Sequence, residues 1–365
     1  MITDNPKYYI LVYSLYFIVS GVFSFLINSL FLKFVKSLGI RNQDDTIIRW
    51  GSQSKPAVGG FSFYIIFLLS IIIYPIFFDS SQVFLNKQFI GVLLAGMLGF
   101  LLGLADDAYN TRPTLKLSTQ ITCGIILLVT GSEISLSYVE IINYILTILW
   151  VVGIMNSMNM LDNMDAITTT VSISIILSAL AVMIFHHEYN SVYFIIMLGV
   201  VASLFGFLFF NWHPSKMYMG DTGSQFLGVF LAAISIRYLW NAEPPNGELI
   251  SARNFFLPLI VFIMPIIDTT TVVINRLSQG KSPFVGGKDH TTHALAYLGL
   301  SDRQVALVFW AVTLISLLLV VVMEKFLKQW TTVYSVLFSI YFLLMFSIFF
   351  TATWSVNKKK RSALK

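Results

Sequence analysis

Long apolar stretches separated by short polar segments recur along the whole chain. Each stretch covers roughly 15 to 23 residues, close to the length that an α-helix needs to cross the hydrocarbon core of a bilayer. The pattern therefore predicts about eleven transmembrane helices. They lie near residues 10–32, 57–78, 89–105, 118–131, 138–155, 166–185, 192–212, 224–240, 255–275, 305–323 and 332–354.

The composition agrees with a chain that lies mostly in lipid. Of its 365 residues, 56% are hydrophobic and only 11% are charged, and the mean hydropathy is +0.79. These values are typical of a polytopic membrane protein and not of a large soluble core. The sequence contains no repeat, no low-complexity tract and no insertion the size of a soluble domain. We therefore expect an all-α polytopic membrane protein, one integral membrane domain over residues 1–365, that does not bind nucleic acid.

The basic residues predict which helix ends face the cytoplasm, because short cytoplasmic loops are enriched in Lys and Arg. With an odd number of helices and an external N-terminus, 6 of the 23 basic residues fall outside and 17 fall on the other side. The side with 17 is predicted to be cytoplasmic. It holds loops near residues 33–55, 106–117, 156–165, 212–223 and 276–304 and the tail 355–365.

The acidic residues check this orientation, because they were not used to choose it. Every glutamate falls outside, whereas the aspartates that could form a site fall at or near the predicted cytoplasmic face. We infer from this separation that the internal aspartates share one cytosol-facing cleft. They are Asp106, Asp107, Asp162, Asp165, Asp221, Asp268, Asp289 and Asp302.

Residues 103–113 (GLADDAYNTRP) place two adjacent carboxylates, Asp106 and Asp107, at the cytoplasmic end of the third apolar stretch. Adjacent carboxylates repel each other unless a cation or a proton lies between them. Such a pair suits Mg²⁺ and can hold one carboxylate as a base. The alternative is a solvated loop that ends a helix before Pro113.

Residues 155–165 read MNSMNMLDNMD, with Asn156, Asn159, Asp162 and Asp165 at steps of three. Carboxylates and amides at membrane depth are costly without partners, so by default they mark a functional site. Each step of three falls about 60° short of a full helical turn, so the four cannot line one side of a straight helix. Either the helix is locally tighter or it ends within the segment, and both options expose backbone groups that suit nucleotide or phosphate binding. The alternative is a polar helix end satisfied by neighbouring helices.

Residues 219–228 (MGDTGSQFLG) come directly before another apolar stretch. Gly220 and Gly223 permit a tight turn, and Thr222 or Ser224 is predicted to cap the helix that follows. The start of such a helix offers unpaired amides to an anion, while Asp221 offers a hard oxygen to a metal ion. We predict that the three polar segments form one site for a divalent cation and phosphates. A well-capped turn is the alternative for this last segment.

The predicted cytoplasmic loop at residues 275–304 carries a cationic group that would face the carboxylates, as expected for binding a diphosphate. Zinc is the rival ligand for a spaced histidine pair. It is disfavoured because no cysteine is near and the carboxylates elsewhere are hard ligands. His213 borders an internal loop without an acidic partner and is interpreted as an interfacial residue. The cationic group comprises Arg276, Lys281, Lys288, His290 and His293.

These segments resemble, in the same order, the motifs of the polyprenyl-phosphate N-acetylhexosamine-1-phosphate transferases. This group, in glycosyltransferase family 4, contains WecA-type enzymes and the phospho-MurNAc-pentapeptide translocase. The resemblance rests on GLADDAYNTRP, NSMNMLDNMD, MGDTGS and KDHTTH, and SKPAVGG at residues 54–60 resembles the family's Lys-Pro…Gly-Gly segment. It extends from about residue 49 to residue 304. Members of the family have a similar number of helices and a cytosolic active site.

The resemblance implies an Mg²⁺-dependent phosphoglycosyltransferase of the bacterial inner (plasma) membrane, with Mn²⁺ as an alternative ion. It would transfer N-acetylhexosamine-1-phosphate from a UDP-sugar to polyprenyl (undecaprenyl) phosphate and release UMP. The lipid-linked product would start a cell-envelope glycan, as in cell wall or in lipopolysaccharide and O-antigen biosynthesis. The Lys-Asp-His-x-x-His loop is closer to WecA-like enzymes, which favours UDP-GlcNAc over UDP-GalNAc or UDP-MurNAc-pentapeptide. Homodimerisation is left open.

By the same resemblance, Asp106 matches the proposed base for the lipid phosphate, Asp107 its metal-associated neighbour and Asp221 the Mg²⁺ ligand. The segment from Asn156 to Asp165 matches the nucleotide and active-site segment of the family. We therefore predict Asp106, Asp107, Asp162 and Asp165 as catalytic residues, Asp107 and Asp221 as metal ligands, and Lys55, Asn156, Asn159, Arg276, Lys288, His290 and His293 as substrate-binding residues.

The chain departs from the family pattern in two places. Thr291 and Thr292 separate His290 from His293, where many relatives have a denser histidine cluster. At residues 162–166 the usual Asp-Gly-x-Asp-Gly reads Asp-Asn-Met-Asp-Ala, so both glycines are replaced. Close approach of the backbone to a ligand is therefore less favoured there, although both carboxylates remain.

Two other functional classes share parts of this pattern. An intramembrane aromatic prenyltransferase also places two Asp-rich motifs at one membrane face to hold Mg-diphosphate, but the Gly-Asp-x-Gly-Ser segment and the basic histidine loop argue against it. A transporter would have broken helices near the midplane and polar positions in both halves of the membrane. Here the carboxylates crowd one face.

Overall fold

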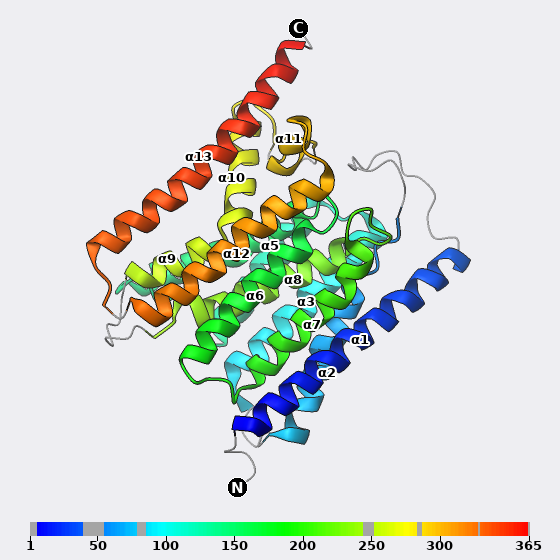
Figure 1. The fold of residues 1–365 in the computed structure, drawn as a ribbon, viewed down its shortest axis with the longest axis vertical. Coiled ribbons are helices and arrows are strands. Elements are labelled where there is room, and N and C mark those ends of the chain that lie inside the picture. The colour runs from blue at the N-terminus through cyan, green and yellow to red at the C-terminus, as the bar shows by residue number, and fades with distance from the viewer. Residues whose placement is uncertain are drawn as a thin grey trace.

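The structure is a computed structural model that describes residues 6–38, 55–78, 85–243, 252–282, 287–327 and 329–363. Within these ranges the chain is almost entirely helical (Figure 1), and the β-type pairing recorded there is one isolated parallel bridge between Ala57 and Tyr218. The all-α prediction is therefore confirmed for this part of the chain. The predicted loop near residues 33–55 lies mostly outside the described ranges.

Each of the eleven predicted apolar stretches is helical. The short helix α11 lies in the predicted loop 276–304. In chain order the helices are α1 (Pro6–Leu38), α2 (Gly60–Phe77), α3 (Lys87–Tyr109), α4 (Pro113–Val129), α5 (Glu140–Leu161), α6 (Ile167–Phe185), α7 (Val192–Asn211), α8 (Gly220–Ser235), the π-helical turn η2 (Ile236–Trp240), α9 (Ala252–Val261), α10 (Ile263–Leu277), α11 (Thr291–Tyr297), α12 (Asp302–Phe326) and α13 (Thr332–Ala363).

Fewer helices can cross a membrane by length and composition than the eleven predicted. Among the described residues eight helices qualify, and a ninth span results if α9 and α10, bent by 76°, are counted as one. The difference arises because α4 has only 17 residues and because α8 stops after 16 residues, where η2 continues it. The chain is a multi-pass membrane protein with interrupted as well as continuous helices.

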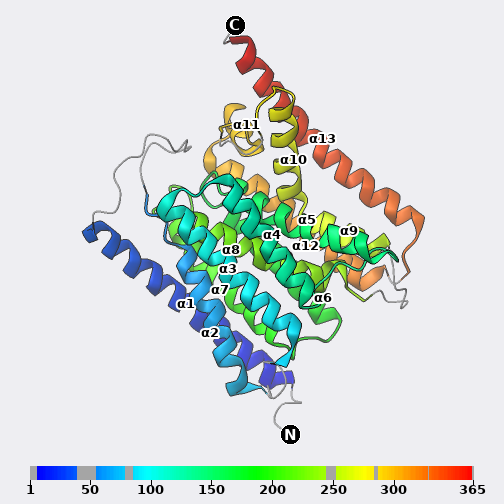
Figure 2. The same cartoon turned by 180° about the vertical axis from the view of Figure 1, so that it is seen from behind.

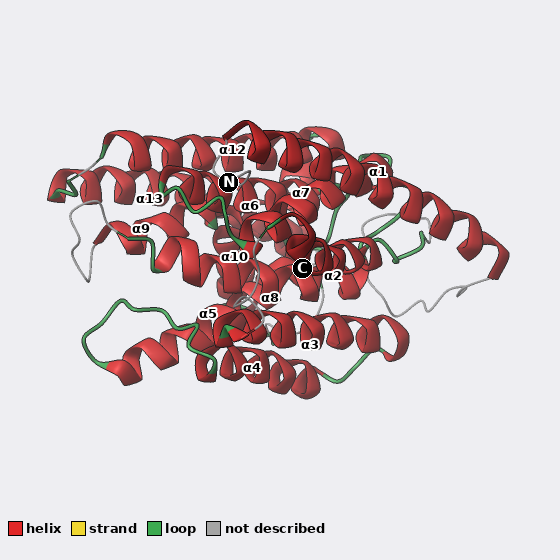
Figure 3. Cartoon of the chain, turned by 90° about the horizontal axis from the view of Figure 1, so that it is seen from below, coloured by secondary structure: helices red, strands yellow, loops and turns green. Residues whose placement is uncertain are grey.

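The helix α8 lies in the middle of the bundle, where it contacts α2, α3, α5 and α6. Seen from below, α3, α4 and α5 lie on one side of α8, and α1, α6, α7 and α12 lie on the other (Figure 3). Nearly every residue from Gly220 to Ser235 is buried. A helix that is enclosed on all sides has little freedom to shift, so the residues at its start are held firmly.

Two glycines let the first turn of α8 approach its neighbours backbone to backbone. A Cβ atom on Gly103 of α3 would lie 2.2 Å from the carbonyl oxygen of Asp221, and one on Gly60 of α2 would lie 2.3 Å from the amide nitrogen of Gly223. Neither distance permits a side chain, so only glycine fits at these positions. The three helices therefore meet at the first turn of α8, which contains Asp221.

One end of the bundle carries additional helices. In Figures 1 and 2, α10, α11 and the C-terminal half of α13 project past the other helices, and the N- and C-termini lie at opposite ends of the molecule. The helix α11 packs against α10, α12 and α13. This packing places the histidines of the predicted loop 276–304 at the end of the molecule where the chain terminates.

Candidate active site

Asp107, near the end of α3, holds the first turn of α8. Its carboxylate oxygens accept hydrogen bonds from the amides of Asp221 (3.0 Å) and Thr222 (2.8 Å) and from the Thr222 hydroxyl (2.6 Å). No side chain of α8 caps its own start, so the predicted capping by Thr222 or Ser224 is wrong. The carboxylate of a neighbouring helix takes these amides instead, because an anion is stabilised by the partial positive charge at a helix start.

Asp106 precedes Asp107 but contacts a different set of residues. One of its oxygens accepts hydrogen bonds from the amide (2.8 Å) and the hydroxyl (2.7 Å) of Thr111. The other oxygen forms an ion pair with Lys116 of α4, whose Nζ also lies 4.0 Å from a carboxylate oxygen of Asp221. Lys116 therefore joins carboxylates from α3 and α8. Sequence reasoning used it only for orientation, although it lies in the predicted loop 106–117.

Asp221 is the second residue of α8, and its side chain is 35% exposed. The side-chain amide of Asn159 donates hydrogen bonds to Asp221 (2.5 Å) and to the Ser224 hydroxyl (2.9 Å). Because α5 ends at Leu161, the second of the two options for residues 156–165, a helix end within the segment, is confirmed. We refer to Asp106, Lys116, Asn159 and Asp221 together as the carboxylate cluster.

Asn156 lies one turn before Asn159 and belongs to a network of side-chain amides. It donates a hydrogen bond to Gln120 of α4 (2.7 Å), and Gln120 donates one to Gln225 of α8 (3.2 Å). These bonds connect three helices beneath the carboxylate cluster. The geometry therefore supports a positioning role for Asn156 in place of the predicted contact with substrate.

Asp165 anchors the connection between α7 and α8 to the loop between α5 and α6. It accepts hydrogen bonds from the amide (2.9 Å) and the hydroxyl (2.7 Å) of Ser215, and the Lys55 Nζ lies 3.5 Å away. Burial alone would raise the pKa of Asp165, but the Ser215 hydrogen bonds and the Lys55 charge hold that pKa below its ordinary value. The carboxylate therefore stays ionised at neutral pH, and its contacts are those of a structural anchor.

His213 was expected to have no acidic partner, and this expectation is wrong. Its Nδ1 lies 3.0 Å from Asp165 and 3.8 Å from Asp302. Asp165 precedes His213 by 48 residues, so no local window of the sequence shows the pair. Lys55 also donates a hydrogen bond to the Ser215 hydroxyl (2.8 Å). The predicted substrate-binding lysine thus reaches the segment that leads into α8.

The histidine segment, residues 288–293, is held by an aspartate of α10. One carboxylate oxygen of Asp268 lies 2.9 Å from Nδ1 of His290, and the other accepts a hydrogen bond from the Thr291 amide (2.8 Å). The rings of His290 and His293 are buried, and their centroids are 5.4 Å apart. Asp268 was grouped with the internal aspartates but given no role. A carboxylate within an apolar stretch was the available signal, and the structure shows that it orients His290.

Arg276 contacts an aspartate of the same loop. Two of its nitrogens bind the two oxygens of Asp289, at 2.8 and 2.7 Å. Burial alone would raise the pKa of Asp289, but the hydrogen bonds and charge of Arg276 hold it below its ordinary value. This pairing supports a structural role for Arg276, whereas Lys288 is exposed at the start of the histidine segment.

The loop after α5, residues 162–166, brings the predicted segments together. Asp162, at the C-cap of α5, is half-buried. Asn163 accepts a hydrogen bond from the Thr292 hydroxyl (2.6 Å), and Asp165 holds Ser215 as described above. With Asn159 bound to Asp221, residues 159–165 contact the start of α8, the connection before it and the histidine segment. All four segments predicted from sequence therefore meet at one end of the bundle.

Ala166 occupies a backbone conformation that favours glycine, with φ 64° and ψ −9°. A residue with a Cβ atom destabilises the folded chain by about 1–2 kcal/mol in this left-handed region. Glycine avoids this strain, and the greater entropy that it gives the unfolded chain costs less than about 1 kcal/mol of stability. We expect Ala166→Gly to raise the free energy of unfolding by about 0.5–1 kcal/mol, measured as a higher Tm in detergent. Ala179→Gly, a buried control in the middle of α6, should lower the Tm. Equal decreases for both variants would contradict strain at Ala166.

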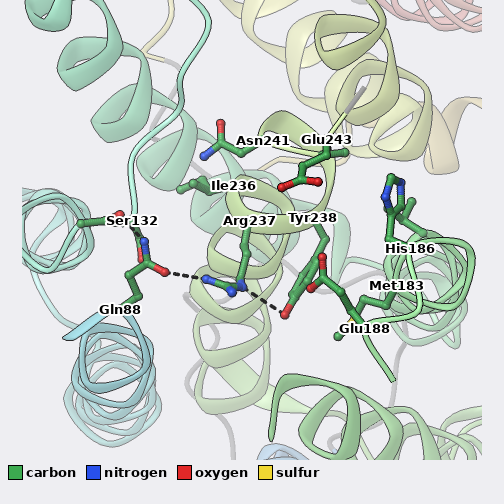
Figure 4. A pocket seen from close by; sticks show the side chains of 13 residues that line it. Gln88, Ser132, Met183, His186, Glu188, Ile236, Arg237, Tyr238, Asn241 and Glu243 are labelled. Carbon is green, nitrogen blue, oxygen red and sulfur yellow. Dashed lines mark hydrogen bonds between the residues drawn. The ribbon is translucent and has the colours of Figure 1, made fainter. Parts of the chain in front are cut away.

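A separate pocket of about 230 Å³ lies at the opposite end of the bundle, between the start of α3, the end of α6 and η2 (Figure 4). Arg237 donates hydrogen bonds there to Gln88 (2.5 Å) and to the Tyr238 hydroxyl (3.1 Å). None of the site residues predicted from sequence lines this pocket. The residues to which the sequence assigned the chemistry therefore lie away from this pocket.

The fold and the site together define a multi-pass helical membrane protein with a polar site of carboxylates, amides and histidines at one end of the bundle. The model of glycosyl transferase family 4 matches residues 89–239, which contain the end of α3, the loop after α5 and the start of α8. This part of the chain is similar to glycosyl transferase family 4, and the resemblance inferred from the sequence motifs is confirmed. The chain is therefore similar to a family of phosphoglycosyltransferases.

Three curated relatives illustrate the range of similarity. A probable undecaprenyl-phosphate N-acetylglucosaminyl 1-phosphate transferase of Bacillus subtilis is 28% identical over 297 residues, 79% of this chain and 77% of the relative. A decaprenyl-phosphate N-acetylglucosaminephosphotransferase of Mycolicibacterium smegmatis is 27% identical over 291 residues, 71% and 69% of the two chains. A phospho-N-acetylmuramoyl-pentapeptide-transferase of Lactobacillus johnsonii is 28% identical over 289 residues, 73% and 84% of the two chains.

Proposed function

We propose that this chain transfers N-acetylhexosamine-1-phosphate, with GlcNAc-1-phosphate favoured, from a UDP-sugar to a polyprenyl phosphate and releases UMP. The observation that carries the proposal is the carboxylate cluster, in which Asp106 and Asp221 meet at Lys116 on the same end of the bundle as the histidine segment. Two of the relatives are named for a polyprenyl-phosphate acceptor and for N-acetylglucosamine, which supports both substrates.

Mg²⁺ fits the donor set of the carboxylate cluster, with Mn²⁺ as an alternative. In the part of the chain that the structure describes, no three His, Cys, Asp or Glu side chains are grouped to hold a metal ion. Mg²⁺ needs no such group, because one or two carboxylates suffice when water and substrate phosphates supply the other ligands. Asp106 and Asp221 would hold the ion, since the oxygens of Asp107 accept hydrogen bonds from α8. Once bound, the ion would neutralise negative charge on the diphosphate.

The proposed reaction brings two anions together, so positive charge must lie between them. An oxygen of the lipid phosphate forms a bond to the β-phosphorus of the UDP-sugar. The bond from that phosphorus to the oxygen shared with the α-phosphate breaks, and UMP leaves with the electron pair. Lys116 offsets the repulsion at this point. Asp106, which forms an ion pair with Lys116, would accept the proton of a monoprotonated lipid phosphate.

An apolar cavity supports the lipid part of the proposal. It measures about 260 Å³ and lies between α5, η2 and the bent pair of α9 and α10, with Trp150 and Ile266 in its lining. Trp150 precedes Asn159 by about 14 Å along α5, at about 1.5 Å per residue. A polyprenyl chain whose phosphate lies at the carboxylate cluster can therefore extend along α5 into this cavity.

We further propose that the site faces the cytoplasm of a bacterium, where UDP-sugars are made. The distribution of basic residues between the two faces supports this orientation. The end of the bundle that carries the carboxylate cluster and α11 is also the end toward which α13 and the C-terminus run (Figure 1). The product would then be a lipid-linked pyrophosphoryl sugar at the inner leaflet, the starting unit of an envelope glycan.

A donor panel tests this proposal. Membranes that contain the chain are given undecaprenyl phosphate, Mg²⁺ and either UDP-GlcNAc, UDP-GalNAc or UDP-MurNAc-pentapeptide, and UMP is measured. We expect the fastest UMP release with UDP-GlcNAc. Preference for another donor would change the assigned sugar but not the assigned reaction. Formation of pyrophosphate and a prenylated aromatic product would support the prenyltransferase, and absence of UMP with every donor would contradict the proposed reaction.

A further inference from the structure

The two places at which the chain departs from the usual family pattern contact each other. The hydroxyl of Thr292 donates a hydrogen bond of 2.6 Å to the side-chain oxygen of Asn163, 129 residues away. We propose that these two residues form a latch that holds the histidine segment against the loop after α5 and so sets the affinity for the donor diphosphate. The inference rests on the proposed function, and it assigns positioning roles to both residues.

One partner of the latch is held by a second hydrogen bond, and the other is buried. The side-chain amide of Asn163 also donates a hydrogen bond of 2.8 Å to the carbonyl oxygen of Met160, in the last turn of α5. Its oxygen is therefore fixed toward Thr292, which is fully buried. A hydrogen bond between two such groups has a defined geometry, so its loss leaves a partly buried acceptor without its donor.

The latch connects two sets of helices that also pack on each other through α5 and α10. The helix α11 packs on α10, α12 and α13, and Asp268 of α10 holds His290 and Thr291. The carboxylate cluster is built on α3, α4, α5 and α8. Thr292 joins the histidine segment to the loop that follows Asn159, so it contributes, with the packing of α10 on α5, to the distance between the histidines and the carboxylate cluster.

This arrangement predicts that the latch affects one substrate more than the other. A donor diphosphate that lies between the histidine segment and the carboxylate cluster contacts both sides, so it loses affinity when they separate. The apolar cavity proposed for the lipid is lined by α5, η2, α9 and α10 and does not include the latch residues. The KM for the lipid should therefore stay unchanged.

Kinetics of three variants test the latch. Thr292→Val keeps the shape of the side chain and removes the hydroxyl, and we expect it to raise the KM for the UDP-sugar roughly tenfold while the KM for polyprenyl phosphate stays within about twofold. Thr292→Ser keeps the hydroxyl, so both KM values should equal those of the unsubstituted chain. Combining Thr292→Val with Asn163→Ala should add nothing to the larger single effect. Additive effects, or equal changes in both KM values, would overturn the latch.

A matched control and a second readout separate the latch from the proposed reaction. Thr313→Val removes a buried threonine hydroxyl that bonds to Ser174 of another helix at 3.1 Å, and it should change neither KM. Hydrogen exchange of residues 288–297 should become faster in Thr292→Val but not in Thr292→Ser or Thr313→Val. This measurement needs no activity. If the unchanged chain released no UMP, the proposed function would fail while exchange still tested the latch; unchanged exchange in Thr292→Val would overturn it.

Discussion

Asp106→Asn and Asp221→Asn are each expected to lower UMP release by about 10²–10⁴-fold, without loss of membrane insertion. Both substitutions keep the size of the side chain and remove one negative charge. They weaken the proposed Mg²⁺ site, and Asp106→Asn also removes the proposed base. Asp221 is partly exposed and Asp106 keeps its hydrogen bonds from Thr111, so neither change should unfold the chain.

The measurement is the initial rate of UMP release in membranes with matched protein content, at several Mg²⁺ concentrations. Glu140→Gln is the control, because Glu140 is exposed at the start of α5, at the opposite end of that helix from the site. It should leave the rate unchanged. Rates for Asp106→Asn and Asp221→Asn that match this control would refute the assignment of the carboxylate cluster.

Asp107→Asn is expected to reduce both activity and stability, because Asp107 holds the start of α8. The carboxylate receives three donated hydrogen bonds on two oxygens. An asparagine offers a single oxygen and turns its own NH₂ group toward a backbone amide, which leaves buried donors unsatisfied at a cost of about 1–3 kcal/mol. Asp221 begins that same turn, so its carboxylate should shift and UMP release should fall by about 10²-fold.

Two measurements on one set of variants distinguish this structural role from metal binding. The Tm in detergent should fall by about 2–4 °C per kcal/mol for Asp107→Asn and should change little for Asp106→Asn. Thr222→Val removes one of the three donors and should give an intermediate decrease in Tm. If Asp107→Asn abolished activity at an unchanged Tm, Asp107 would be a metal ligand, as the sequence resemblance implied, and not the cap of α8.

The helices could be predicted because an uncharged stretch of membrane length has few alternatives to a helix in lipid. The interruptions could not. The sequence near residues 224–240 is mostly apolar, yet α8 changes to a π-helical turn at Ile236. Such a change depends on how the helix packs against its neighbours. The bend between α9 and α10 is likewise a property of the assembled bundle.

The convergence of the acidic segments could be predicted because each one lies at the end of an apolar stretch on the same predicted face. Their individual partners could not be predicted. Asp107 binds Thr222 across 115 residues, and Asp165 binds His213 across 48. The local rule that a threonine or serine caps a helix failed at α8 because a carboxylate from α3 had already taken the amides. Distances along the sequence carry no information about such contacts.

The fate of the β-phosphate of the donor tests the central claim most directly. UDP-GlcNAc with a radioactive β-phosphate is incubated with the membranes, polyprenyl phosphate and Mg²⁺, and the lipid and the nucleotides are then separated. The account predicts that the label is extracted with the lipid and that the released nucleotide is unlabelled UMP. Label recovered in UDP would mean that the sugar moves without its phosphate, and it would contradict the proposed reaction.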